Sequence, residues 1–536
     1  MGEGASARDQ HPASYAGAAL CLVLASGPAA ADGEPQRFNV WEFRVRGSTV
    51  LDRQAVERAV YPFLGPGRSI DDVEHARQAV EKLYQEARYD AALVDIPEQD
   101  VQGGVVVLAV TEGKIERVKI SGSRYFSLGR IREKLPALAD GKPLNLQQTQ
   151  TQLAELAEQS GDRRITPVIR AGQTPGAVEV ELKVDDRLPL HGSVELTTRN
   201  SVNTGLLRLS AMLRYDNLWQ RFHSASLQYQ LAPEHTDNVE VWAGTYVMPV
   251  EAWDSRLAFY GVGLNSSSKV PVATVGDLTV IGNGEIFGLR LIHPLPAEPG
   301  WQHSLTLGWD YKHFGQSVLL GGTAAQSSPI TYLPFLAGYD GVRAWSDGST
   351  SEFGVELNLA VRDLFGSQDQ FAAKRYGARA DYFYAAGKLE HTQVLPGDFR
   401  GVIRLSGQIT DSPLVSNEQL SAGGMQTVRG YHQSERLGDD GGLASVELLG
   451  PDLAERSGWG EGGLRPLLFS DAAYLRLHQA LPGNPGRYQL WSMGAGLKLG
   501  LHQKLHGEFY WAYPFSPTEI VRVGEQRVDF RVAYEY

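Results

Sequence analysis

Cysteine is almost missing from this sequence, because only one of its 536 residues, Cys21, carries a thiol. Cys21 lies in a segment that we expect to be removed from the mature chain. A mature chain without cysteine excludes a disulfide framework and a thiolate metal site, and it suits an oxidising compartment. The thirteen histidines show no HExxH motif or other paired ligand spacing, so we expect no metal and no cofactor.

An excess of positive charge is also missing. The chain has 50 Lys and Arg residues against 62 Asp and Glu residues, which gives a net charge of -12. A nucleic-acid partner would need a basic face, so we expect no nucleic acid to bind. The sequence also lacks a G-x-S-x-G nucleophile elbow and a GxxxxGK(S/T) phosphate loop. These absences favour a protein that is not an enzyme.

Long apolar runs are the third absence. After residue 31 no stretch approaches the roughly 18 uninterrupted apolar residues that a transmembrane helix needs. A membrane location is still open, because the strands of a transmembrane barrel hide their apolar residues in alternation with polar ones.

We predict a secretory signal peptide over residues 1–31. The run Tyr15–Gly27 is short and apolar, and Ala29–Ala31 offers an A-x-A cleavage site. The residues before it contain Arg8 but also two acidic side chains, so the usual positive region is weak. A disordered cytoplasmic leader is the alternative.

Residues 38–187 predict two small α+β domains with the same order of elements, β-α-α-β-β. We place the first at 38–113 and the second at 114–187, and each is large enough for one small core. Ser69 with Asp72 forms a helix-capping signal in the first domain. A pair of ordinary adaptor domains is the alternative interpretation of this pattern. The expected strands are 40–46, 91–96, 105–110, 114–121, 165–170 and 177–184.

Beyond Arg187 the helical period disappears, and segments of about ten residues alternate between apolar and polar residues. This alternation indicates a barrel with lipid outside and a charged, wet inner face. We therefore predict an all-β transmembrane barrel of about 16 antiparallel strands over 188–536. A soluble β-sandwich or propeller is the alternative, although strands in soluble sheets are usually shorter. The expected strands are 191–199, 205–216, 221–231, 238–248, 254–265, 284–293, 303–313, 330–340, 352–362, 374–385, 401–410, 442–450, 465–475, 489–499, 504–513 and 527–536.

The number of strands decides on which side of the membrane each connection lies. The two preceding domains place the start of the first strand in the periplasm, and an even number of strands returns the C-terminus there. The longest connection, 411–441, joins the eleventh strand to the twelfth. It therefore falls on the extracellular side, where barrels keep their long loops.

The connection 411–441 contains the stretch GGMQTVRGYHQSERLGDDGG, and a second short motif, FSDAA, follows in the next predicted strand but one. Both motifs resemble those of the two-partner-secretion transporters, haemolysin secretion/activation proteins of the ShlB/FhaC/HecB type. The resemblance covers residues 38–536 and includes Ile96–Val118, which is similar to the junction of two polypeptide-transport-associated (POTRA) domains, and Asp216–Gln230. The residues that match the VRGY/F motif of the family are Val428, Arg429, Gly430 and Tyr431.

The resemblance implies that the loop 411–441 folds back into the lumen, where Arg429 pairs with Asp471. Phe469 belongs to the same partner-strand motif as Asp471, although Ala473 stands where the family has glycine. The alternation agrees, because Leu468, Ala472 and Tyr474 are expected to face lipid and Phe469 and Asp471 to face inward. We interpret Arg429 and Asp471 as a latch. A solvated arginine in a turn made by Gly430 is the alternative.

The family resemblance also implies a function and its partners. We expect an outer-membrane transporter that captures an unfolded β-helical exoprotein in the periplasm, either an adhesin or a haemolysin, and moves it to the cell surface. Folding of the client outside would drive the transfer. The chain is expected to act as a monomer in outer-membrane lipid. An outer-membrane insertase and a passive porin are the alternatives.

The last strand resembles the C-terminal signal by which the barrel assembly machinery recognises outer-membrane barrels. The aromatic residues of this pattern fall in register on one face of the strand, and the final one is Tyr where Phe is more usual. These residues are Phe530, Tyr534 and Tyr536.

Overall fold

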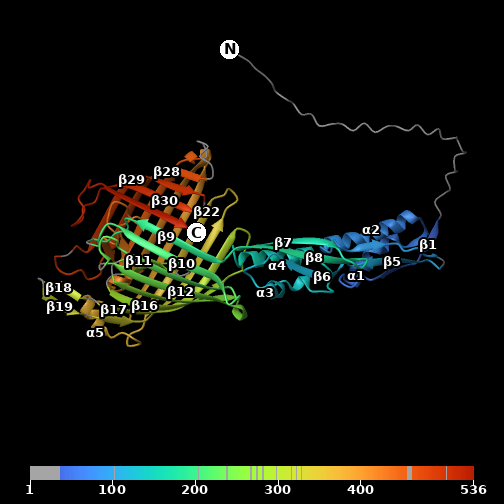
Figure 1. Cartoon of the computed structure of the whole chain (residues 1–536), viewed down its shortest axis with the longest axis horizontal. Helices are drawn as coiled ribbons and strands as arrows, with labels where there is room; N and C mark the ends of the chain where they lie inside the picture. Colours follow the sequence, from blue (N-terminus) through green and yellow to red (C-terminus); the bar gives the residue numbers. More distant parts are fainter. Residues whose placement is uncertain are drawn as a thin grey trace, which may run out of the picture. The chain divides into compact units, whose positions relative to one another are not determined.

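The structure is a computed structural model that describes residues 37–536 apart from 102, 203, 237–238, 266–267, 273–275, 281–282, 297, 316, 321–322, 328, 455–461, 484 and 503. The predicted signal peptide at 1–31, with Cys21, lies outside the described residues. The chain divides into two compact units. The first unit contains the residues up to Arg117 with 137–149 and 170–179, and the second contains the rest. Figure 1 shows the helix-containing α+β domains in blue to teal and the barrel strands in green to red.

The first α+β domain packs two helices against a small sheet. In this sheet β5 lies in the centre, with β2 parallel to it on one side and β4 antiparallel on the other. A two-stranded ribbon of β1 and β3 is added, which the sequence pattern did not predict. The elements in chain order are β1 (Phe38–Val40), β2 (Glu42–Arg46), α1 (Arg53–Val60), the 3-10 turn Tyr61–Phe63, β3 (Gly65–Arg68), α2 (Ile70–Glu86), β4 (Leu93–Asp95) and β5 (Val105–Thr111).

Helix α2 begins where the sequence predicted a cap. The Ser69 side chain accepts a hydrogen bond from the backbone N–H of Asp72, and the Asp72 carboxylate accepts one from the backbone N–H of Ser69. This reciprocal box satisfies two backbone donors that a helix start leaves free. The apolar face that follows packs into the core of the domain with Leu108 and Val106 of β5. The buried residues of this face are Val73, Ala76, Val80 and Tyr84.

A buried carboxylate ties the end of β5 to the segment before α1. Glu112 is 4% exposed, and its side chain accepts hydrogen bonds from the backbone N–H of Val50 at 3.0 Å, from the Tyr84 hydroxyl at 3.0 Å and from Thr49. Burial raises the pKa of the Glu112 carboxyl, but the hydrogen bonds from Thr49, Val50 and Tyr84 outweigh burial, so the pKa lies below its ordinary value.

The second α+β domain repeats the order of elements. Its sheet has the order β6-β8-β7, and the β-α-α-β-β order predicted for both domains is confirmed. Its first helix stops at Glu133, and a separate 3-10 turn begins at Pro136, which cannot continue a helix. The elements are β6 (Lys114–Ser121), α3 (Leu128–Glu133), the 3-10 turn Pro136–Leu138, α4 (Leu146–Glu158), β7 (Arg163–Ala171) and β8 (Ala177–Asp186).

Within the second unit, the segment before α3 contacts the first periplasmic turn of the barrel. The side-chain amide of Gln220 accepts from the Ser127 N–H at 2.9 Å and donates to the Tyr125 carbonyl at 3.0 Å. The Arg163 guanidinium lies 4.8 Å from the Phe126 ring centroid and 5.1 Å from that of Phe222. Both interactions involve the turn 219–222, which joins the second and third strands of the barrel, so this turn is a docking point as well as a connection.

Among the described residues, sixteen antiparallel strands form a closed barrel, as predicted. The last strand pairs with the first, and β20 and β21 are two parts of one strand that both pair with β17. The strands are β9 (Leu190–Thr197), β10 (Arg208–Leu218), β11 (His223–Leu231), β12 (Glu240–Val250), β13 (Ser255–Asn265), β16 (Asn283–Pro294), β17 (Trp301–Gly315), β20 (Ile330–Tyr332) with β21 (Pro334–Ala344), β22 (Thr350–Ala360), β23 (Phe383–Leu395), β24 (Phe399–Thr410), β27 (Asp440–Leu449), β28 (Gly462–Arg476), β29 (Arg487–Leu501), β30 (Leu505–Pro514) and β31 (Arg527–Glu535).

The prediction of a strand at 374–385 was wrong. Helix α5 (Gln368–Lys374), capped by Ser367, ends where this strand was predicted to begin, and strand β23 starts only at Phe383. Ala378, Ala380 and Tyr382 are all nearly fully buried, so they alternate with exposed residues as a strand would. They do so because they pack onto an apolar cluster between loops, and period two alone does not distinguish that case from a strand.

Two further hairpins extend beyond the barrel wall without having been predicted. One consists of β14 (Ser268–Val272) and β15 (Gly276–Val280), and the other of β18 (Ser317–Leu320) and β19 (Thr323–Ser327). None of the described helices has the length and apolar character needed to cross a membrane.

The two faces of the barrel wall differ as the alternation predicted, with one correction. Large apolar side chains on the outside are exposed, for example Leu213, Phe259 and Leu468, whereas their neighbours in the sequence face inward. The inner face is charged around the strands β27 and β28, but it is not charged throughout. At the extracellular ends of β12 to β23, inward residues such as Val262 and Phe314 form a buried apolar cluster with parts of the loops.

Replacing Glu112 with Gln should destabilise the first α+β domain by about 1–3 kcal/mol, because buried donors lose a charged acceptor. Because the pKa of Glu112 is lowered in the folded state, its contribution to the free energy of unfolding is fully present above pH 4.5. This contribution is lost as the pH falls below 4.5 and through the lower pKa of the folded state. Urea unfolding, followed by proteolysis of residues 38–113 in the full chain, should give a lower free energy of unfolding for Glu112→Gln than for the wild type at neutral pH. The difference between the two proteins should become smaller in acid. A gap that widens in acid would contradict this assignment.

Candidate functional site

The connection between β24 and β27 crosses the inside of the barrel. It runs from 411 to 439, since β27 begins at Asp440 and not, as predicted, at residue 442. It contains a 3-10 turn at Ser416–Glu418 and a short hairpin of β25 (Leu420–Ala422) and β26 (Arg436–Gly438). The loop contacts β17 and β23 through Glu418 and β27 and β28 through Arg429, so it reaches well-separated parts of the wall.

The Arg429 side chain meets Asp471 in a bidentate ion pair. Its Nε and Nη2 donate to the two carboxylate oxygens of Asp471, each at 2.7 Å, and the backbone N–H of Arg429 donates to the same carboxylate at 3.1 Å. Arg429 is 3% exposed and Asp471 is fully buried. Two parallel charge-assisted bonds fix both the position and the plane of the guanidinium.

Two further groups complete the surroundings of the guanidinium. Nη1 donates to the Glu447 carboxylate at 2.6 Å and Nη2 donates to the Ser445 hydroxyl at 3.2 Å. The Arg429 Cζ lies 3.6 Å from the ring centroid of Phe469 and 5.0 Å from that of Tyr510. The cation therefore lies over an aromatic face while its N–H groups meet oxygen acceptors, which replaces the water that burial removes.

The register of β27 with β28 places these groups together. Ser445 lies opposite Asp471, and Glu447 lies opposite Phe469. All four side chains lie on the inner face, because residues two apart in a strand share a face. The guanidinium therefore contacts two neighbouring cross-strand pairs of the wall, Ser445 with Asp471 and Glu447 with Phe469.

The residues on either side of Arg429 are also fixed. Val428 is fully buried among Leu443, Leu475 and other apolar side chains. Gly430 has φ of +94°, and an added Cβ would lie 3.2 Å from the Cβ of Ala512, so both the backbone conformation and the close approach favour glycine. The Tyr431 hydroxyl lies 3.0 Å from the carbonyl oxygen of Trp491 and 2.9 Å from that of Ser516.

Glu447 is a site residue that the sequence reasoning missed. It is 2% exposed, and besides Arg429 it pairs with Arg404 at 2.8 Å and Lys498 at 3.1 Å. The signal for it was present, because Glu447 lies between the outward residues Val446 and Leu448 and must therefore face inward. A single carboxylate shared by three cations links β24, β27, β29 and the loop.

The C-terminal aromatic residues lie apart from this site. Phe530, Tyr534 and Tyr536 are on the outward face of the last strand, where Tyr534 and Tyr536 are exposed. The backbone N–H of Tyr536 donates to the carbonyl of Gly192 at 2.8 Å, so the end of the chain continues the seam with β9.

One group with the spacing of metal ligands occurs among the described residues: Asp162, His191 and Asp216. Both carboxylates already accept from arginines, Asp162 from Arg187 at 2.7 Å and Asp216 from Arg214 at 3.1 Å. These ion pairs account for the cluster without a cation.

Comparisons with known proteins agree with this geometry. The family model for the ShlB-type POTRA domain matches residues 38–113. The model described as haemolysin secretion/activation protein ShlB/FhaC/HecB matches residues 176–499, which is more than half of the chain. The chain belongs to the ShlB/FhaC/HecB family.

Curated relatives of the family cover most of the chain. The outer membrane transporter CdiB of Dickeya dadantii is 24% identical over 416 residues, which are 77% of this chain and 72% of that protein. The heme/hemopexin transporter protein HuxB of Haemophilus influenzae is 20% identical over 429 residues, 76% of this chain and 72% of that protein.

Solved structures share the fold. CdiB from Escherichia coli superposes with a TM-score of 0.60 at 19% identity, over 95% of this chain and 93% of that one. BamA from Haemophilus ducreyi lacking POTRA domains 1–3 superposes with a TM-score of 0.56 at 13% identity, over 93% of this chain and 100% of that one.

The family match and the curated relatives identify the function. This ShlB/FhaC/HecB-family protein is an outer-membrane transporter that exports a partner protein, with its N-terminal POTRA domain in the periplasm.

Removing Asp471 should release the loop from the wall of this transporter. Arg429 then loses its bidentate partner and keeps only Glu447, which Arg404 and Lys498 also share, and breaking a buried ion pair costs about 3–5 kcal/mol. Val428→Cys, in a chain with Cys21 replaced by Ser, reports on release, since residue 428 is fully buried. Maleimide labelling of this cysteine should accelerate at least about tenfold when Asp471→Ala is added.

The matched control is Asp398→Ala, which removes an aspartate paired with Arg465 at 3.0 Å but far more exposed. Labelling in this control should equal that of the parent. Equal labelling rates in the parent and in the Asp471→Ala protein would show that the ion pair does not hold the loop.

Proposed function

We propose that Arg429 and Asp471 form a latch that sets the state of the export conduit. The observation that carries this proposal is the buried bidentate pair between a loop and the inner wall, because it fixes a segment that lies across the path of a client. A buried ion pair adds little net stability compared with an apolar contact of equal size. Its advantage is a defined geometry that can be broken and remade, which suits a moving part.

The partner, in this proposal, is a large β-helical exoprotein, an adhesin or a haemolysin, that enters unfolded. The family description, haemolysin secretion/activation protein, supports a secreted cargo, and the relatives CdiB and HuxB are both named as transporters. Folding of the client at the cell surface, with burial of its apolar residues, would supply the driving force. Arg429 and Asp471 would hold the loop in place until the client arrives.

Capture of the client is assigned to the edges of the two α+β sheets, with the second domain acting as a second POTRA domain. In the first sheet β4 is an edge strand, and Leu93 on it is 61% exposed. In the second sheet β7 is an edge strand, and Ile169 on it is 42% exposed. An extended client can add to such an edge through backbone hydrogen bonds that tolerate many sequences.

The outward aromatic residues of the last strand are assigned to biogenesis. Phe530, Tyr534 and Tyr536 would be read by the barrel assembly machinery before the barrel closes, after which the transporter works as a monomer in outer-membrane lipid. An insertase would share the barrel fold, as the likeness to BamA illustrates, but the family match favours export. A passive porin would leave the latch without a role.

Deleting the gene should remove one large exoprotein from the cell surface and the medium, and a comparison of secreted proteins with and without the gene identifies it.

Restoring the gene with Arg429→Ala or Asp471→Ala should leave the exoprotein unsecreted while the barrel still inserts. Folded barrel in the membrane is checked by its heat-modifiable mobility in gels.

Lys388→Ala is the matched control for Arg429→Ala, because Lys388 pairs at 3.1 Å with Asp340, which is itself a residue of the wall. This control should secrete at the wild-type level. Normal secretion by both latch variants would remove the latch proposal, and an unchanged set of secreted proteins after deletion would remove the export proposal.

A further inference from the structure

Three extracellular loops meet at one buried carboxylate, that of Asp439. Asp439 is fully buried. It accepts hydrogen bonds from both terminal nitrogens of Arg375, which follows α5 in the loop 361–382. It also accepts from the backbone N–H of Leu414 at 3.0 Å and from the Gln419 side chain at 2.9 Å, both in the loop 411–439. The backbone N–H of His478, in the loop after β28, donates to it at 2.7 Å.

Arg375 connects the same three loops from the other side. Besides Asp439, its guanidinium donates to the carbonyl oxygen of Leu414 and, at 3.1 Å, to that of His478. The ion pair is bidentate and closed to water on the carboxylate side, so its geometry is fixed. Extracellular loops are usually solvated and variable, and a buried ion pair that joins three of them is therefore a specific feature.

An apolar cluster lies beside this junction and fills one side of the extracellular mouth. Phe371 of α5 is 1% exposed, and its ring centroid lies 5.4 Å from that of Tyr332 and 6.0 Å from that of Tyr382. The cluster continues onto inward residues of the wall, including Val262, and onto Leu414 of the long loop. The loop with α5 is thus packed inward onto the wall like part of a protein core.

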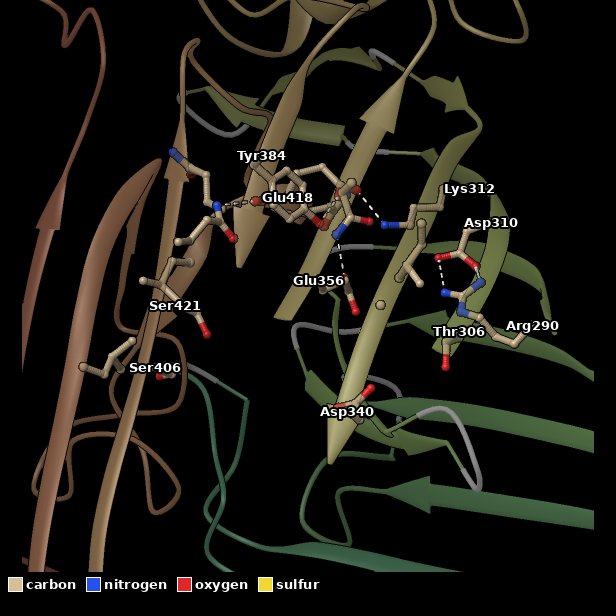
Figure 2. Close-up of a pocket in the computed structure, with 18 of the residues that line it drawn as sticks. Arg290, Thr306, Asp310, Lys312, Asp340, Glu356, Tyr384, Ser406, Glu418 and Ser421 are labelled. Atoms are coloured by element: carbon tan, nitrogen blue, oxygen red, sulfur yellow. Dashed lines mark hydrogen bonds and ion pairs between the residues drawn. The ribbon is translucent and has the colours of Figure 1, made fainter. Parts of the chain in front are cut away.

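A polar cavity of about 350 Å³ begins where this cluster ends. Figure 2 shows Glu418, Lys312 and Tyr384 together in it, with Arg290 and Asp310 next along the wall. Glu418 accepts from Lys312 at 2.7 Å, from Tyr332 at 2.6 Å and from Tyr384 at 3.1 Å. Glu418 therefore anchors the start of the long loop at the border between the cavity and the apolar cluster.

We propose that the loop 361–382 with α5 is a cap over the exit of the conduit and that the Arg375–Asp439 pair is the fastening that holds it shut. This inference rests on the proposed export function. Asp439 is a positioning residue, because it acts by holding three loops together. The long loop 411–439 carries Arg429 near its middle and Asp439 at its end, so a movement that opens the lumen must also strain the cap. Release of the latch and opening of the exit are thereby coupled.

The test is the single-channel conductance of the purified full-length protein in planar lipid bilayers, with no partner protein present. Arg375→Gln keeps Asp439 and its backbone donors but removes the cation, so the cap should open. The fraction of time spent in a conducting state should rise at least about tenfold over the wild type. Uptake of a large antibiotic such as vancomycin by intact cells should rise with it.

Arg379→Gln is the matched control. Arg379 lies in the same loop and pairs at 3.3 Å with Asp381 of that loop, and 47% of the Arg379 side chain and 37% of the Asp381 side chain are exposed. Conductance of this control should equal that of the wild type. If Arg375→Gln does not insert, Arg375→Lys decides the question in the same way, because lysine keeps the positive charge but cannot make the bidentate pair with Asp439.

Wild-type conductance in an inserted Arg375→Gln protein would overturn the proposal, and so would an equal rise in Arg379→Gln. Failure of the export function would be seen separately, as an unchanged set of secreted proteins after deletion of the gene. The conductance result does not depend on that outcome, because it is measured without a client.

Discussion

The structure depends on the cost of taking one guanidinium out of water. Arg429 is buried inside the barrel, and a cation there is unfavourable unless hydrogen bonds and opposite charge replace its hydration. Asp471, Glu447 and Ser445 supply them, and Phe469 supplies an aromatic face. Because these partners come from two adjacent strands in one register, the position of the loop and the alignment of β27 with β28 are determined together.

The closed wall makes this arrangement possible. Side chains along each strand point alternately to lipid and to the lumen. A charged side chain at an inward position therefore does not contact lipid. The lumen therefore collects acidic and basic side chains that must pair with one another, as in the clusters of Arg429 with Asp471 and of Lys312 with Glu418. These two clusters anchor different parts of the same loop to different parts of the wall.

The extracellular side adds a different kind of packing. There the inner face of β12 to β23 is apolar, and α5 with its loop covers it as a small core. At its edge Asp439 pairs with Arg375, and Glu418 accepts hydrogen bonds from the hydroxyls of Tyr332 and Tyr384. This protein thus combines a polar interior of paired charges with an apolar cluster under the loop that carries α5.

The sequence predicts the features that depend on neighbouring residues, and it does not predict those that depend on contacts between distant residues. The sixteen strands, their faces and the inward direction of Arg429's partner Asp471 depend on period two, which is written locally in the chain and could be predicted. The segment 375–382 after helix α5 was mistaken for part of a strand because Ala378, Ala380 and Tyr382 alternate in burial for tertiary reasons. Glu447 faces inward by parity alone, yet its three cationic partners come from β24, β29 and the loop. The convergence of Arg375, Leu414 and His478 on Asp439 was decided only by the closed barrel, since hydrogen bonds between residues far apart in the sequence leave no periodic signal.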